Sequence, residues 1–126
     1  MVLFEGLQSY GLLLLRLAIG SIFLYHGSHK LAAWKKTPNF FRFLGIAETL
    51  GGLATIAGFL TQLANIGFAI IMLGALYHKI YKWHIAFSAE QTSGWEFDLI
   101  LLGAALALAT LGAGSFSIDA LAGFYP

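Results

Sequence analysis

The sequence carries very little charge for its length, and it has no cysteine. Only 10% of its 126 residues are charged, whereas a soluble domain usually carries about 25%. So little charge is unsuited to a surface in water, and the composition indicates a membrane protein. The formal net charge of +1 excludes a nucleic-acid partner, because that binding needs a basic stripe. The absence of cysteine excludes disulfides, thiol redox chemistry and thiolate metal ligands within the chain.

Long hydrophobic runs make up most of the sequence, in which 59% of the residues are hydrophobic. Crossing a bilayer takes about 20 apolar residues in a helix, with about 17 as the lower limit. Four segments qualify, at about residues 7–27, 40–60, 63–79 and 95–112. They are continuous and rich in Leu, Ala and Gly instead of alternating, which argues against strands. The sequence therefore predicts an all-α, polytopic membrane protein: a four-transmembrane-helix bundle in one domain, residues 1–126.

The basic residues predict how the chain lies across the membrane. Six of the seven lie in or beside the first and third loops, which share one side of a four-span chain: Lys30, Lys35, Lys36, Arg42, Lys79 and Lys82. Cytoplasmic loops are enriched in Lys and Arg, so these two loops are expected in the cytoplasm and both termini outside it.

Small residues recur at helical spacing within the spans. They predict close helix packing, because adjacent helices in lipid associate through backbone contact. They are also compatible with a homo-oligomer. The expected stripes are Ala47, Gly51, Ala54 and Gly58 in the second span, Gly67 and Gly74 in the third, and Gly103 and Ala107 in the fourth.

Two charged residues fall near the middle of the spans. A charge in hydrocarbon costs about 2.5–3.5 kcal/mol on insertion scales, so each requires a partner or a role. Arg16 and Glu48 lie at similar expected depths and are predicted to form a pair inside the bundle. Asp119 is the alternative partner of Arg16, if the tail folds back. The pair could fix helix register or bind a ligand.

A second polar layer is expected nearer the cytoplasm. It contains His26, His78 and Asp98, with His29 and Glu96 close by. Three interpretations remain open. The groups could be solvated interfacial residues, or they could line a pocket for a polar headgroup such as a quinone, supplying hydrogen bonds and protons. The third is a metal or haem site, which is disfavoured because the Glu-x-x-His pairs of di-iron bundles are absent.

The order of motifs resembles the DoxX family of four-helix membrane proteins over nearly the whole chain. Arg16-Leu-Ala-Ile-Gly20 and Phe23-Leu-Tyr-His26-Gly27 precede Lys30, Gly51-Gly52 follows Glu48, and Gly112-Ala-Gly114 precedes Ser117-Ile-Asp119. The family signature falls on Arg16, Gly27, Lys30, Glu48, Gly52, Gly112, Gly114 and Asp119. The resemblance implies a multi-pass protein of the prokaryotic cell (inner) membrane, often associated with oxidoreductase systems. It does not imply a catalytic set.

These observations lead to the hypothesis of a membrane subunit that binds a quinone or similar redox molecule and works with a separate redox partner protein. In it, Arg16 holds a ligand oxygen, Glu48 and His78 exchange protons, and His26 with Asp98 tunes the entrance. His29, Lys30, Glu96 and Asp119 are secondary candidates, and no metal site is predicted. The alternative is a non-enzymatic scaffold or assembly factor, so catalysis itself stays open. A small transporter is a third reading, disfavoured because no span is broken by proline.

Overall fold

The structure, a computed structural model, describes residues 3–124, and within that range all regular secondary structure is helical. This confirms the predicted all-α class. The elements, in chain order, are α1 (Gln8–Ala32), η1 (Trp34–Lys36), α2 (Asn39–Ala57), α3 (Thr61–Tyr77), η2 (His78–Lys82), α4 (Trp95–Leu111) and α5 (Ile118–Leu121).

Three helices are long and apolar enough to cross a membrane. They are α1 with 25 residues, α2 with 19, and the continuous helix formed by α3 and η2 with 22. The last measures about 33 Å at 1.5 Å per residue, enough for a hydrocarbon core of about 30 Å. The chain is therefore a multi-pass membrane protein. The helix α4 has 17 residues, so its role as a fourth span stays a prediction.

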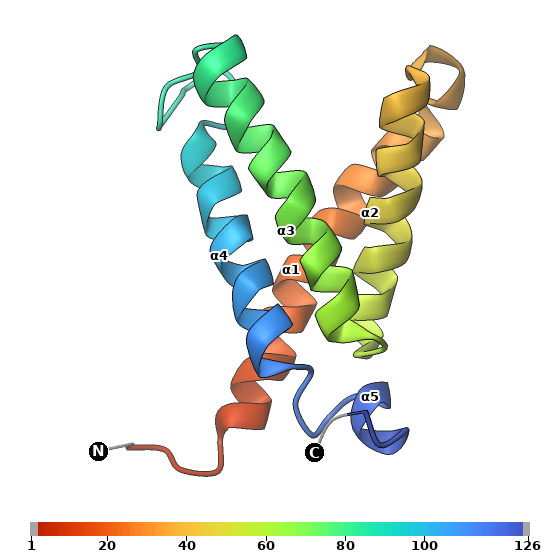
Figure 1. The fold of residues 1–126 in the computed structure, drawn as a ribbon, viewed down its shortest axis with the longest axis vertical. Coiled ribbons are helices and arrows are strands. Elements are labelled where there is room, and N and C mark those ends of the chain that lie inside the picture. The colour runs from red at the N-terminus through yellow and green to blue at the C-terminus, as the bar shows by residue number, and fades with distance from the viewer. Residues whose placement is uncertain (1–2, 125–126) are drawn as a thin grey trace.

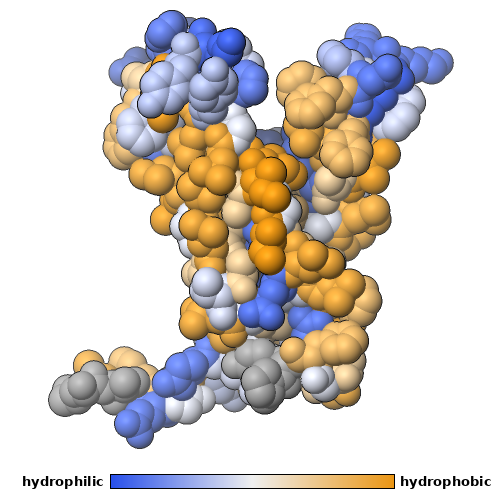
Figure 2. Space-filling view, viewed as in Figure 1, coloured by the Kyte–Doolittle hydropathy of each residue, from blue (hydrophilic) through white to orange (hydrophobic). Residues whose placement is uncertain are grey.

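The helices form two hairpins, α1 with α2 and α3 with α4, that diverge from one end of the molecule (Figure 1). The N-terminus, the C-terminal part and the α2–α3 turn lie at the joined end, while the α1–α2 and η2–α4 loops lie at the separated tips. Figure 2 shows a cleft between the hairpins, with apolar surface along both and hydrophilic side chains at the tips. The arrangement is thus an open V rather than a closed four-helix bundle.

The first hairpin is held together by glycines that bring two backbones into contact. A Cβ on Gly27 would lie 2.6 Å from the Thr49 nitrogen, and one on Gly52 would lie 2.8 Å from the Gly20 carbonyl oxygen. Helices approach this closely only where side chains are absent, as is common in membranes. The same contact explains why α1 continues five residues beyond the predicted span, because Gly27 serves packing rather than ending the helix.

The predicted small-residue stripes of the third and fourth spans are wrong as packing surfaces within the chain. A Cβ on Gly67, Gly74 or Gly103 would have no atom within 4 Å, leaving out its own helix and chain neighbours. The glycines of the second-span stripe do pack, since a Cβ on Gly51 would meet the Phe68 ring of α3 and one on Gly58 would meet the Ser117 side chain. The error arose because glycine spacing alone does not say which helix face meets a neighbour. The predicted homo-oligomer stays a prediction.

Two local features shape the end of the chain after α4. Gly112 stops α4 with φ at 82°, a conformation that favours glycine. The Ser117 side chain then accepts a hydrogen bond from the Ala120 nitrogen and caps α5. This turn brings α5 back against the start of α3.

An apolar core joins the two hairpins below the cleft. The Phe23 ring of α1 stacks on the Phe68 ring of α3 with centroids 3.7 Å apart. Leu101, Ala105 and Leu108 of α4 are buried in the same cluster. The core therefore holds the two hairpins together at the joined end of the V, and it does not fill the cleft between their separated ends.

Candidate functional site

Arg16 lies in a buried polar cluster at the joined end of the hairpins, and its side chain is 2% exposed. It donates to the carbonyl oxygens of Thr55 and Ile56, each at 3.0 Å. It also donates to those of Ala113 and Phe116, each at 2.8 Å. The first two carbonyls lie in the last turn of α2, where a helix leaves carbonyl groups without partners. Arg16 therefore ties α1 to the end of α2 and to the turn after α4.

Asp119 of α5 belongs to the same polar cluster and lies against the start of α3. Its carboxylate accepts hydrogen bonds from the Leu60 nitrogen at 2.6 Å and the Thr61 nitrogen at 2.9 Å. These are free donors at the start of α3, and a carboxylate there also favours the helix dipole. The tail folds back as the alternative prediction required, but Asp119 caps α3 and forms no ion pair with Arg16 in the described part of the chain.

The predicted Arg16–Glu48 pair is wrong, because the register of the first hairpin separates the two residues. Gly52 packs on Gly20 and Gly45 packs on Gly27. Glu48 therefore lies opposite the middle of the 20–27 segment, roughly 11 Å along α1 from the level of Arg16. Side chains also lean toward the N-terminus of their own helix, so on antiparallel helices these two lean apart.

A cavity of about 810 Å³ lies between the separated parts of the hairpins. We call it the inter-hairpin cavity. It is lined by Phe23, His26 and Lys30 of α1, by Phe40, Phe41, Phe43, Leu44 and Glu48 of α2, by residues of α3, η2 and the following loop, and by Phe97, Asp98 and Leu101 of α4. The walls are mainly aromatic and aliphatic, with the ionisable groups contributed by both hairpins. Ligand pockets commonly have this character and volumes of about 300–1,000 Å³.

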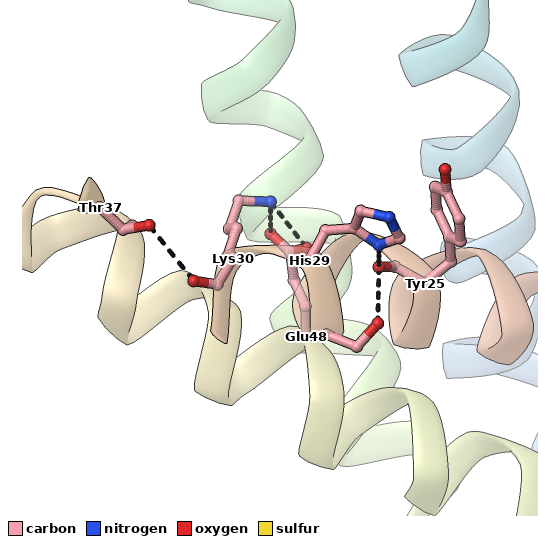
Figure 3. A network of polar contacts seen from close by, with 6 residues as sticks. Tyr25, His29, Lys30, Thr37 and Glu48 are labelled. Atoms are coloured by element: carbon pink, nitrogen blue, oxygen red, sulfur yellow. Dashed lines mark hydrogen bonds and ion pairs between the residues drawn. The ribbon is translucent and has the colours of Figure 1, made fainter. Parts of the chain in front are cut away.

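The first hairpin contributes an ion pair to the cavity wall. The Lys30 ammonium donates to both carboxylate oxygens of Glu48, at 3.1 and 3.0 Å (Figure 3). The Glu48 side chain is 5% exposed and that of Lys30 is 27% exposed. A carboxylate this deeply buried requires a compensating cation. Lys30 supplies it, in the role that the sequence analysis predicted for Arg16.

The second hairpin contributes a matching ion pair. Lys79 of η2 lies 2.6 Å from the Oδ2 atom of Asp98 on α4, and it also donates to the Ser93 hydroxyl at 2.9 Å. The Lys79 side chain is 13% exposed and that of Asp98 is 7% exposed, so both charges of this pair are largely buried.

The histidines differ in how they are engaged. The Nδ1 atoms of His29 and His78 lie 2.9 and 2.8 Å from the carbonyl oxygens of Tyr25 and Gly74, each one turn earlier in its own helix. His78 lines the cavity; His29 and the exposed Glu96 do not. His26 lines the cavity with no hydrogen bond to its ring from any described residue.

Of the five primary candidates, the structure brings four together in the inter-hairpin cavity: His26, Glu48, His78 and Asp98. Arg16 lies elsewhere, and Lys30 joins the site from the secondary set. Their part in ligand binding stays a prediction. In the described residues, no group of three or more His, Cys, Asp or Glu side chains could hold a metal ion.

Comparison with known sequences gives the family. The profile of the DoxX family matches residues 11–80. The chain belongs to the DoxX family. It is also 29% identical over 119 residues to a Bacillus subtilis (strain 168) protein named "Putative oxidoreductase CatD", covering 86% of this chain and 84% of that protein. No solved structure gives a significant match.

The DoxX match covers one side of the cavity more fully than the other. Residues 11–80 include the Lys30–Glu48 pair, His26 and His78, whereas Asp98 lies in α4 beyond the match. Sequence reasoning missed Lys79 as a site residue in this DoxX protein. A usable signal was present, because a buried Asp98 needs a cation and Lys79 is the lysine of the preceding helix that lies deeper in the predicted span.

Proposed function

We propose that this DoxX-family protein is the membrane subunit of an oxidoreductase system and binds a quinone, or a similar small lipid-soluble redox molecule, in the inter-hairpin cavity. The observation that carries the proposal is the combination of apolar aromatic walls with two ion pairs and two histidines in one cavity of about 810 Å³. Similarity to a protein named as an oxidoreductase supports the redox association.

The walls suit a ligand with a flat ring and an apolar tail. Phenylalanine rings offer stacking surfaces for a quinone ring, and the ionisable groups supply hydrogen bonds to its oxygens. Phe40 and Phe43 of α2 and Ile70 of α3 line the cavity and are exposed. A lipid-soluble ligand could therefore enter sideways from the bilayer between these two helices.

The proposed topology has four spans, with α4 as the fourth and the separated tips in the cytoplasm of a prokaryotic cell. At about 26 Å, α4 is at the short end of spanning length. Six of the seven basic residues lie in or beside the tip loops, as cytoplasmic loops require. The cavity mouth then faces the compartment from which a separate redox partner protein would supply or take electrons.

A bulky side chain at Gly74 is expected to weaken quinone binding. Gly74 lines the cavity, and a Cβ there meets no atom within 4 Å outside its own helix, so the variant Gly74→Phe has room to fold. Its ring would take space that the ligand needs, and the Kd should rise at least about tenfold, equivalent to 1.4 kcal/mol. Equilibrium dialysis with short-tailed menaquinone and ubiquinone analogues in nanodiscs measures this.

Gly67→Phe is the matched control, because Gly67 lies two turns earlier on the same helix, has the same open surroundings and does not line the cavity. It should bind as the wild type does. Wild-type protein that binds neither analogue would contradict the proposed function and leave the alternative of a non-enzymatic scaffold. The buried Arg16 cluster supports that alternative, because its hydrogen bonds hold the helices together and leave no group for a ligand. Equal affinity in both phenylalanine variants would contradict the proposed location.

A further inference from the structure

Six ionisable side chains line the inter-hairpin cavity, and five of them already have a partner. Lys30 is paired with Glu48 and Lys79 with Asp98. The His78 ring is held by the Gly74 carbonyl. The sixth is His26, whose ring receives or donates no hydrogen bond within residues 3–124. It is therefore the one cavity imidazole in that range with both nitrogen atoms free for a ligand.

His26 also lies where the two hairpins meet across the cavity. It is carried by α1, and its ring centroid is 6.0 Å from that of Phe97 on α4. His26 is exposed and lines the cavity. A ligand between the hairpins can therefore reach its ring without displacing an existing hydrogen bond.

Resting on the proposed function, we infer that His26 is the direct hydrogen-bonding partner of the ligand's ring oxygen, and that the site accepts both the quinone and the quinol. A neutral imidazole has one donor and one acceptor nitrogen, so it can donate to a carbonyl oxygen or accept from a hydroxyl. The lysines can only donate and the carboxylates, when ionised, can only accept. His26 is thus suited to both redox forms of the same ligand.

The test compares His26→Leu with His26→Gln, measured on the quinone and quinol forms of a short-tailed ubiquinone analogue. Leucine removes both hydrogen-bonding atoms, and the Kd for each form should rise about tenfold, the effect of a lost hydrogen bond. Glutamine keeps a donor and an acceptor, so its Kd should stay within about threefold of the wild type. His29→Leu, on the same helix but outside the cavity, should leave both Kd values unchanged.

Infrared difference spectroscopy supplies a readout that a merely structural role would not move. The bound quinone carbonyl band should be shifted to lower frequency in the wild type and in His26→Gln, and unshifted in His26→Leu. Wild-type affinity for both ligand forms in His26→Leu, or an unchanged shift in that variant, would overturn the inference while the proposed function stands. Failure of the wild type to bind either form would instead overturn the proposed function.

Discussion

Replacing Arg16 by methionine is expected to lower the free energy of unfolding by about 3 kcal/mol or more, because three carbonyls lose their donor at about 1–3 kcal/mol each, while the Thr55 carbonyl keeps the Gly58 nitrogen. The guanidinium makes four hydrogen bonds to backbone carbonyls from two separate parts of the chain, the end of α2 and the turn after α4. Methionine fills similar space but donates to none of them. A loss of this size is a large fraction of the 5–15 kcal/mol that stabilises a typical protein.

Steric trapping or denaturation in mixed micelles would measure the Arg16→Met effect. Lys36→Met is the matched control, because Lys36 is exposed in η1 and makes no side-chain hydrogen bond to another described residue; its stability should match the wild type. Arg16→Lys should give an intermediate value, since an ammonium lacks the planar, five-donor geometry. Wild-type stability in Arg16→Met would mean that these bonds are not needed and that Arg16 is available to a ligand.

Lys30→Met is expected to destabilise the protein by roughly 2–4 kcal/mol, because removing one partner of a buried ion pair leaves the other charge unpaired. The charge left unpaired would be that of Glu48, whose side chain is 5% exposed and whose two carboxylate oxygens both accept from the Lys30 ammonium. The double variant Lys30→Met with Glu48→Leu should regain most of the loss, as apolar replacements of buried pairs commonly do.

A double-mutant cycle over Lys30 and Glu48, measured by the same unfolding assay, separates these effects. Glu48→Leu alone should cost less than Lys30→Met, because the Lys30 side chain is 27% exposed and can reach water. Additive losses in the double variant, with no recovery, would contradict the assigned pairing. Recovery with Arg16→Met in place of Lys30→Met would restore the pairing first predicted from depth.

The helical segments could be predicted from the sequence because they depend on local features. Apolar runs of bilayer length defined the segments, although α1 extends five residues beyond its predicted end. The spacing of charges did indicate which residues lie inside the fold. It could not say which of them meet, because contact depends on register between helices.

Register was the decisive missing quantity. The contacts of Gly20 with Gly52 and of Gly27 with Gly45 shift α1 along α2 by about one and a half turns relative to an alignment of the predicted span centres. That shift sends Arg16 to the end of α2 and gives Glu48 to Lys30. The divergence of the hairpins was also unpredictable, because no local pattern encodes the angle between two helix pairs.

The stabilising polar cluster and the candidate site lie at opposite ends of the molecule. The joined end holds a polar cluster whose groups satisfy one another, with Arg16 and Asp119 bonded to backbone. The separated end holds ion pairs within each hairpin but none between them in the described residues. Under the proposed function a ligand would supply contacts across the cavity, and its binding should stabilise one spacing of the hairpins.

Photoaffinity labelling with an azidoquinone in native membranes, mapped by mass spectrometry, tests most directly whether the inter-hairpin cavity is the binding site. A ligand in the cavity predicts labels on both hairpins at wall residues such as Phe23, Leu44 and Phe97, removed by excess unlabelled quinone. Labels confined to outward-facing residues such as Leu14 and Ile100, and unaffected by competitor, would mean that quinone only dissolves in the lipid around the protein.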